Sequence, residues 1–225
     1  PDSLVVEVSG LVHCARMPKT ASLTRPAPAV VMLHGWGGDE AAMWVFRQAV
    51  PAAAAIITPR APIDPGIGGY VWFTYLDAAR AHPDPGVLQS SLKRLRHFLH
   101  SLPDVYPVDP ARLVLVGFSQ GAAMVNSIVL GGYIHPLGVV SLAGFIPNLP
   151  GRTTGAVVRP NLPVFIAHGL RDDVVSVEEG RRVRDLYTRQ GANVTYREDP
   201  VGHKVHTRTI KALKSWLDGL LQPAS

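Results

Sequence analysis

The sequence around Ser119 has the pattern of a turn that presents a nucleophile. Ser119 lies between Gly117 and Gly121, directly after an apolar run at residues 113–116. That run predicts a buried parallel strand, and the apolar residues at 122–128 predict the helix that follows it. Side chains at positions 117 and 121 would collide with so sharp a turn, which explains the two glycines. The alternative is a glycine-rich turn with an incidental serine.

A serine hydroxyl is a weak nucleophile near neutral pH, so it needs a base to accept its proton and a carboxylate to orient that base. Both follow predicted strands downstream. Asp172 and Asp173 come after the run at 164–167, and His203 comes after the run at 194–197. We favour Asp172 because it lies at the turn, whereas Asp173 begins the segment that leads to the next helix.

Four other residues compete for catalytic roles and are assigned structural ones. His203 follows a glycine in a loop, whereas His206 lies where the last helix begins and is expected to brace that loop. His34 and His168 each precede a glycine at the end of a strand, where a histidine usually bonds to loop backbone. Cys14 has no glycine turn around it and is expected to be a buried structural thiol.

A tetrahedral oxyanion requires two backbone N–H groups aimed at one point. One is expected from Gln120, the residue after the serine, and the other from Trp36 in the loop after an early strand. Gly35, Gly37 and Gly38 would let that loop approach the serine closely. A merely flexible turn is the alternative for this loop.

The elements that must position these residues alternate between strand-like and helix-like runs. Such alternation predicts an α/β protein with a mostly parallel central sheet and helices on both faces. Leucines at three- and four-residue steps over 88–102 predict an amphipathic helix, as does the stripe at 210–220. Ser176 with Glu179 predicts a capping box, and Gly191 ends that helix. Residues 4–15 are expected to add antiparallel edge strands. The predicted parallel strands are residues 29–33, 54–58, 112–116, 137–142, 164–167 and 194–197.

The composition predicts one compact domain over residues 1–225. Hydrophobic residues make up 47% of the chain and charged residues 17%, which excludes intrinsic disorder. No apolar run approaches the roughly 18 residues that cross a bilayer, so we expect no stable membrane insertion. A leader removed before Pro1 is compatible with the sequence. The single cysteine predicts a fold without disulfides, for which the cytoplasm is the default compartment.

The formal charge of +5 comes mostly from scattered arginines. The tightest group, Arg181, Arg182 and Arg184, alternates with apolar residues at helical spacing, which is typical of a solvated helix face and not of a nucleic-acid site. We therefore expect no nucleic-acid partner. No tight cluster has metal-ligand spacing, so we expect neither a metal nor an organic cofactor. A homodimer is compatible with the sequence.

Several blocks together carry a family resemblance over residues 29–218. The sequence resembles the phospholipase/carboxylesterase family of α/β-hydrolases, which includes the acyl-protein thioesterases. The resemblance implies an α/β-hydrolase fold, Ser119 as nucleophile, Asp172 as acid, His203 as base, and an oxyanion hole from the amides of Trp36 and Gln120. The blocks are Leu33-His34-Gly35-Trp36-Gly37-Gly38-Asp39, Arg60-Ala61-Pro62, Trp72-Phe73, Gly117-Phe118-Ser119-Gln120-Gly121-Ala122, Leu142-Ala143-Gly144-Phe145-Ile146-Pro147, His168-Gly169-Leu170-Arg171-Asp172 and Gly202-His203.

Two positions depart from the family pattern. Asp173 stands where the family often has proline after the acid. Trp36 stands where leucine is common and would place a bulky ring beside the acyl site.

The short, Pro- and Gly-containing interval at 143–163 predicts no large cap domain and therefore an open substrate groove. Short and medium acyl esters fit such a groove best. Thioester or lysophospholipid hydrolysis by the same residues is the second interpretation, and a non-catalytic binding protein on this fold is the third. Phe118 and Phe145 could equally belong to the core. The residues expected to line the groove are Trp36, Trp72, Phe73, Phe118, Phe145 and Ile146.

Overall fold

The computed structural model describes residues 4–8, 10–66, 68–78, 82–147 and 158–222. Within these residues one eight-stranded sheet has the order β1-β2-β4-β3-β5-β6-β7-β8. At one edge β1 pairs antiparallel with β2, and β2 pairs antiparallel with β4. The six remaining strands, β3 to β8, are parallel to one another. The α/β fold with a mostly parallel sheet and antiparallel edge strands is therefore confirmed. The strands are β1 (Leu4–Val8), β2 (Leu11–Arg16), β3 (Ala27–Leu33), β4 (Ala55–Pro59), β5 (Val108–Phe118), β6 (Gly138–Leu142), β7 (Pro163–Gly169) and β8 (Asn193–Asp199).

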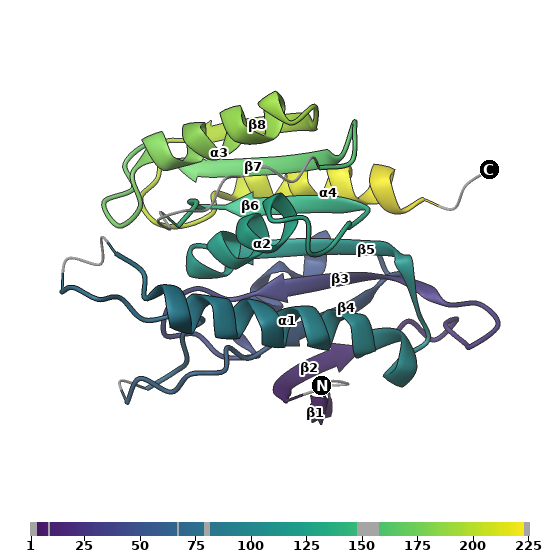
Figure 1. Cartoon of the computed structure of the whole chain (residues 1–225). Helices are drawn as coiled ribbons and strands as arrows, with labels where there is room; N and C mark the ends of the chain where they lie inside the picture. The colour runs from purple at the N-terminus through teal and green to yellow at the C-terminus, as the bar shows by residue number, and fades with distance from the viewer. Residues whose placement is uncertain (1–3, 9, 67, 79–81, 148–157, 223–225) are drawn as a thin grey trace.

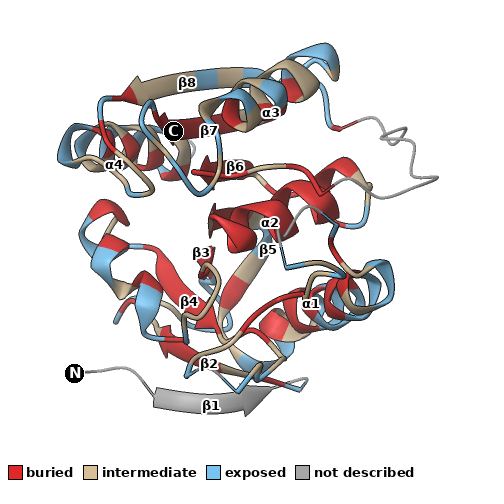
Figure 2. Cartoon of the chain, turned by 90° about the vertical axis from the view of Figure 1, so that its left-hand side faces the viewer, coloured by how far each residue is buried: buried red, intermediate tan, exposed pale blue. Residues whose placement is uncertain are grey.

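Helices cover both faces of this sheet (Figure 1). Helices α1 (Pro85–Val105), α2 (Gln120–Leu130) and α3 (Val177–Arg189) pack on one face. Helix α4 (Thr207–Leu221) and the short 3₁₀ helix η1 (Ala42–Ala49) pack on the other. Figure 2 shows α3 and α4 on opposite sides of the strands, with buried residues concentrated between the layers.

The central strands are buried on both sides, which explains their continuous apolar sequences. In β3, Val31 and Leu33 join the core beneath α1, α2 and α3, whereas Val30 and Met32 join the core beneath η1 and α4. All seven residues of this strand are buried. Burial on both faces fixes the register of the strand that leads to the Gly35–Gly38 loop.

The helix ends agree with the sequence in part. Gly191 follows the C-terminal cap of α3 with φ +79°, the left-handed conformation that glycine adopts without strain. Ser176 is the N-cap of α3 as expected, but its side chain makes no capping hydrogen bond, so the capping-box prediction is wrong. Helix η1 was not predicted, because its helical spacing extends over only eight residues, fewer than the roughly 11 to 18 over which such a pattern is judged.

The carboxyl ends of the parallel strands all lie at the same end of the sheet, the end toward which the β3 and β7 arrows point in Figure 1. Ligands of open α/β sheets bind outside the carboxyl ends of the strands. The link from β6 to β7 is short, and its residues 148–157 lie outside the described part of the chain. In the described residues, no helix is long and apolar enough to cross a membrane.

Candidate active site

Ser119 occupies the turn between β5 and α2 and has a strained backbone, with φ +53° and ψ −117°. The flanking glycines permit this turn. A Cβ atom on Gly117 would lie 2.4 Å from the Cα of Ala122, and one on Gly121 would lie 2.2 Å from the carbonyl oxygen of Leu33. Backbone atoms fill both places. The expected collision with the turn itself is confirmed for Gly117, whereas a side chain on Gly121 would collide with the end of β3.

One histidine joins the serine to a carboxylate. The Nε2 atom of His203 lies 2.9 Å from Ser119 Oγ, and its Nδ1 atom lies 2.8 Å from Asp172 Oδ2. Since an ionised carboxylate only accepts, Nδ1 carries the hydrogen and Nε2 is left to accept the serine proton. The Asp172 side chain is fully buried, whereas 18% of the His203 side chain is exposed. The histidine is thus partly open to solvent, whereas the acid is not.

The loop after β7 holds the Asp172 carboxylate in place. Its Oδ1 atom accepts hydrogen bonds from the backbone N–H groups of Val174 and Val175, at 3.0 and 2.9 Å. Asp173 is exposed, and it is the Asp172 carboxylate that lies within hydrogen-bond distance of His203, which favours Asp172 of the two carboxylates that the sequence left in competition.

The competing histidines have structural contacts. His206 is the N-cap of α4, where its Nδ1 accepts from the N–H of Arg208 at 3.2 Å. His34 uses both ring nitrogens on the backbone, donating to Gly35 O at 2.7 Å and accepting from Ala61 N at 2.9 Å. Burial lowers the pKa of His34 and so favours the neutral ring that this arrangement needs.

Cys14 is a buried residue of β2, as expected. Burial raises the pKa of its thiol, which keeps it protonated and unreactive.

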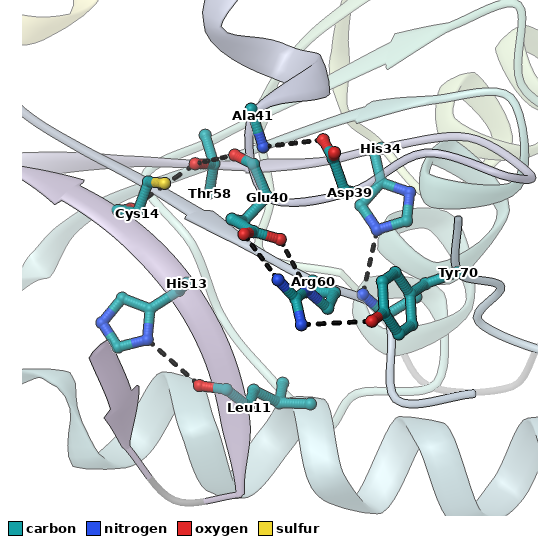
Figure 3. A network of polar contacts seen from close by, with 11 residues as sticks. Leu11, His13, Cys14, His34, Asp39, Glu40, Ala41, Thr58, Arg60 and Tyr70 are labelled. Atoms are coloured by element: carbon teal, nitrogen blue, oxygen red, sulfur yellow. Dashed lines mark hydrogen bonds and ion pairs between the residues drawn. The ribbon is translucent and has the colours of Figure 1, made fainter. Parts of the chain in front are cut away.

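The loop after β3 is fixed to its neighbours. Gly37 N donates to Tyr70 O at 2.9 Å, and Tyr70 N donates to Gly38 O at 2.8 Å. Beyond them, Arg60 makes two hydrogen bonds to the carboxylate of Glu40, at 2.5 and 2.6 Å, and its guanidinium lies 4.5 Å over the ring of Tyr70 (Figure 3). These contacts argue against a merely flexible turn.

The side chain of Gln120 ties the serine turn to a neighbouring segment. It accepts from Trp72 N at 2.8 Å and donates to Phe73 O at 2.7 Å, while Trp72 Nε1 donates to His34 O at 2.9 Å. Trp72 and Phe73 are therefore turned into the core and are 0% exposed. Neither ring lines the cavities beside Ser119 and His203, so the expectation that they line the groove is wrong. The hydrogen bonds to the Gln120 side chain hold this segment with both rings in the core.

Two cavities flank the reacting atoms, and we name each by the residue that lines it. The Ser119 pocket, about 330 Å³, is lined by Ser119, Gln120, Phe145 and Ile146 among others. The His203 pocket, about 430 Å³, is lined by His203, Phe118 and apolar residues of η1. Trp36 lines both cavities. Phe145 and Ile146 thus lie at the Ser119 pocket and Phe118 lies at the His203 pocket, and their contact with a substrate stays a prediction.

Sequence reasoning missed the η1 residues of the His203 pocket. Met43 and Phe46 are apolar residues at helical spacing, a signal that a core helix also gives. In the described part of the chain, no group of three or more His, Cys, Asp or Glu side chains could hold a metal ion.

Comparison with known proteins decides the family. The model of the family described as "Phospholipase/Carboxylesterase" matches residues 19–221. The chain belongs to the phospholipase/carboxylesterase family. It is thus a hydrolase of the carboxylesterase and acyl-protein thioesterase type, and the family implies ester substrates.

Individual relatives agree with this placement. "Acyl-protein thioesterase 1" of Debaryomyces hansenii is 27% identical, over 96% of this chain and all of that one. "Acyl-protein thioesterase 1" of Mycosarcoma maydis is 30% identical, over 72% and 76%. Among solved structures, the Bacillus cereus carboxylesterase superposes with a TM-score of 0.82 at 25% identity, covering 93% of this chain and 94% of that one.

Proposed function

We propose that this family member is a serine carboxylesterase that hydrolyses short to medium acyl esters through an acyl-enzyme. The observation that carries the proposal is the position of His203, within hydrogen-bond distance of both Ser119 Oγ and the Asp172 carboxylate. Nucleophile, base and orienting acid are defined by such geometry. The family itself specifies ester hydrolysis but neither the triad nor the acyl length.

In the first half-reaction, Ser119 Oγ attacks the ester carbonyl carbon while its proton moves to His203 Nε2. The Asp172 carboxylate stabilises the imidazolium that forms. The negative charge on the carbonyl oxygen is stabilised by the backbone N–H groups of Trp36 and Gln120. The carbon–oxygen bond to the alcohol then breaks, and the departing oxygen keeps the electron pair and takes the proton from Nε2.

In the second half-reaction a water molecule replaces the alcohol. His203 Nε2 takes a proton from the water as its oxygen attacks the acyl carbon. The bond to Ser119 Oγ breaks, Oγ regains its proton, and the carboxylic acid leaves.

The size of the Ser119 pocket supports short and medium acyl groups. Its volume of about 330 Å³ lies near the lower end of small-molecule sites, about 300–1,000 Å³. The second candidate is acyl-protein thioester hydrolysis by the same residues, which the names of the fungal relatives favour.

The triad is tested with paired variants. We expect Ser119→Ala and His203→Ala to lower kcat by roughly 10⁴- to 10⁶-fold. The neighbouring changes Asp173→Asn and His206→Ala serve as matched controls for Asp172→Asn and His203→Ala. Labelling of the folded protein by a fluorophosphonate probe should be lost in Ser119→Ala and retained in the two control variants, Asp173→Asn and His206→Ala. Near-normal turnover in Ser119→Ala would overturn the mechanism.

The acyl preference is tested by comparing p-nitrophenyl acetate, butyrate and palmitate with a palmitoylated peptide thioester. The highest kcat/KM is expected for acetate or butyrate. A clear preference for the palmitoyl thioester would favour the second candidate and leave the triad intact.

A further inference from the structure

The two cavities divide the reacting groups between them. Ser119 and Gln120 line the Ser119 pocket, whereas His203 lines the other pocket. The cavities also belong to different layers of the fold. The Ser119 pocket includes residues Val175 and Glu179 at the start of α3, and the His203 pocket includes residues of η1 and of α4. Helices α3 and α4 lie on opposite sides of the sheet (Figure 2).

The proton transfer from His203 to the departing alcohol determines on which side of Ser119 the alcohol half of an ester lies. During acylation the departing alcohol oxygen must take its proton from His203 Nε2, so it must come within hydrogen-bond distance of that atom. The acyl carbon stays bonded to Ser119 Oγ, and its oxygen must point toward the amide of Gln120. The alcohol therefore extends on the side of His203, which leaves the Ser119 pocket for the acyl chain.

We infer that the His203 pocket is a subsite for the alcohol half of the substrate and that it takes an uncharged alkyl or aryl alcohol. This inference rests on the proposed function and names the leaving group that the function leaves open. The pocket volume of about 430 Å³ is sufficient for a group of this kind. Most of the side chains that line it are apolar, and the exposed Lys204 is the one lysine or arginine among them. The apolar residues that line it are Met43, Val45, Phe46, Phe118, Val205 and Ile210.

Aromatic packing keeps this wall next to the proton-transfer atom. The ring of Phe118 lies 5.0 Å from the ring of His203, measured between centroids. Phe118 directly precedes the serine, so the same turn that presents Ser119 also places an apolar surface beside His203. A bulky apolar alcohol can therefore be buried while its oxygen stays within reach of Nε2, and that burial contributes to binding in the transition state.

Trp36 is the residue that the two subsites share, because it lines both cavities. Its ring lies 5.7 Å from that of Tyr75, on the side of the Ser119 pocket. Acyl preference and alcohol preference should therefore be set by different residues and be separable by substitution.

The test uses two ester series and one variant in each pocket. One series keeps the butyryl group and varies the alcohol through ethanol, benzyl alcohol and naphthylmethanol. The other keeps ethanol and varies the acyl group through acetyl, butyryl and hexanoyl. Ala42→Phe adds a ring to the His203 pocket, and Val174→Phe adds one to the Ser119 pocket. Both positions are exposed, so the fold tolerates the change.

Ala42→Phe should lower kcat/KM for benzyl relative to ethyl butyrate by about tenfold, and change the ratios within the acyl series by less than about twofold. Val174→Phe should do the reverse. The butyryl-enzyme no longer contains the alcohol, so its hydrolysis rate in Ala42→Phe should equal that of the unaltered protein. Ile210→Ala enlarges the pocket and should raise the relative rate for the naphthylmethyl ester, with the melting temperature reported alongside.

Two outcomes would overturn the inference. In the first, Ala42→Phe alters the acyl series and butyryl-enzyme hydrolysis but leaves the alcohol series unchanged, which would assign the pocket to the acyl chain. In the second, Ala42→Phe and Ile210→Ala both leave every ratio unchanged. Either result is compatible with an inactive Ser119→Ala variant, so failure of the subsite is distinguishable from failure of the proposed triad.

Discussion

His168 Nε2 lies 3.4 Å from Asp172 Oδ2, the same carboxylate oxygen that is bonded to His203. The same nitrogen lies 2.9 Å from the carbonyl oxygen of Val175, which can only accept, so Nε2 carries the hydrogen. Within the described residues the other nitrogen, Nδ1, is buried and has no hydrogen-bond partner. His168 is thus held as one tautomer, with its N–H directed at the loop that carries the acid.

We predict that His168 positions this loop and that its N–H, not its size, matters. His168→Gln keeps an N–H at similar reach, whereas His168→Leu removes it and leaves Val175 O without its donor. The leucine variant should lose roughly 10- to 100-fold in kcat, because small displacements of a catalytic group cost that much, with KM little changed. The glutamine variant should recover most of the loss. Steady-state kinetics with p-nitrophenyl butyrate give both constants, and equal kcat values for the two variants would contradict the prediction.

The strained backbone at Ser119 predicts that replacing this residue by glycine raises the free energy of unfolding, although the nucleophile is lost. A non-glycine residue at φ +53° and ψ −117° costs about 1–3 kcal/mol, and glycine relieves much of that cost. Ser119→Gly should therefore unfold with a free energy about 1 kcal/mol higher than Ser119→Ala, while both are inactive. Denaturant unfolding measures the difference.

The control for this comparison is Ala123→Gly, in the regular part of α2. There the same alanine-to-glycine change should lower the free energy of unfolding by about 1 kcal/mol. If Ser119→Gly proved no more stable than Ser119→Ala, the turn would store no strain that glycine can release.

The serine turn could be predicted from sequence because its cause is local. Two missing side chains, Gly117 and Gly121, and one buried strand suffice to define it. The order of Asp172 and His203 after strands was also readable, since parallel strands end at one edge. The choice between Asp172 and Asp173 needed the backbone N–H groups of the loop, which sequence does not reveal.

The lining of the cavities was predicted less well, because it depends on long-range contacts. Trp72 and Phe73 are apolar and lie in a loop, which suits a groove, yet hydrogen bonds to Gln120 turn both rings into the core. Met43 and Phe46 show the converse error, in which residues that look like core also line a cavity. Their helical spacing suggests core, and both are buried, but they also form a wall of the His203 pocket. Burial and cavity lining are compatible for the same side chain.

The ion pair between Glu40 and Arg60 predicts a pH-dependent stability. Hydrogen bonds from Arg60 lower the pKa of Glu40 below its ordinary value of 4.5, so the folded state prefers the carboxylate. The stabilisation is complete above pH 4.5 and is lost as the pH falls through the lowered value.

Glu40→Gln should cost roughly 1–3 kcal/mol of unfolding free energy at pH 7. The deficit relative to the unaltered protein should shrink in urea titrations below pH 4.5. Glu178→Gln, which removes the exposed partner of Arg181, should change stability by less than about 0.5 kcal/mol at either pH. A Glu40→Gln deficit that stayed constant from neutral to acid pH would show that packing, and not the charge, stabilises the Gly35–Gly38 loop.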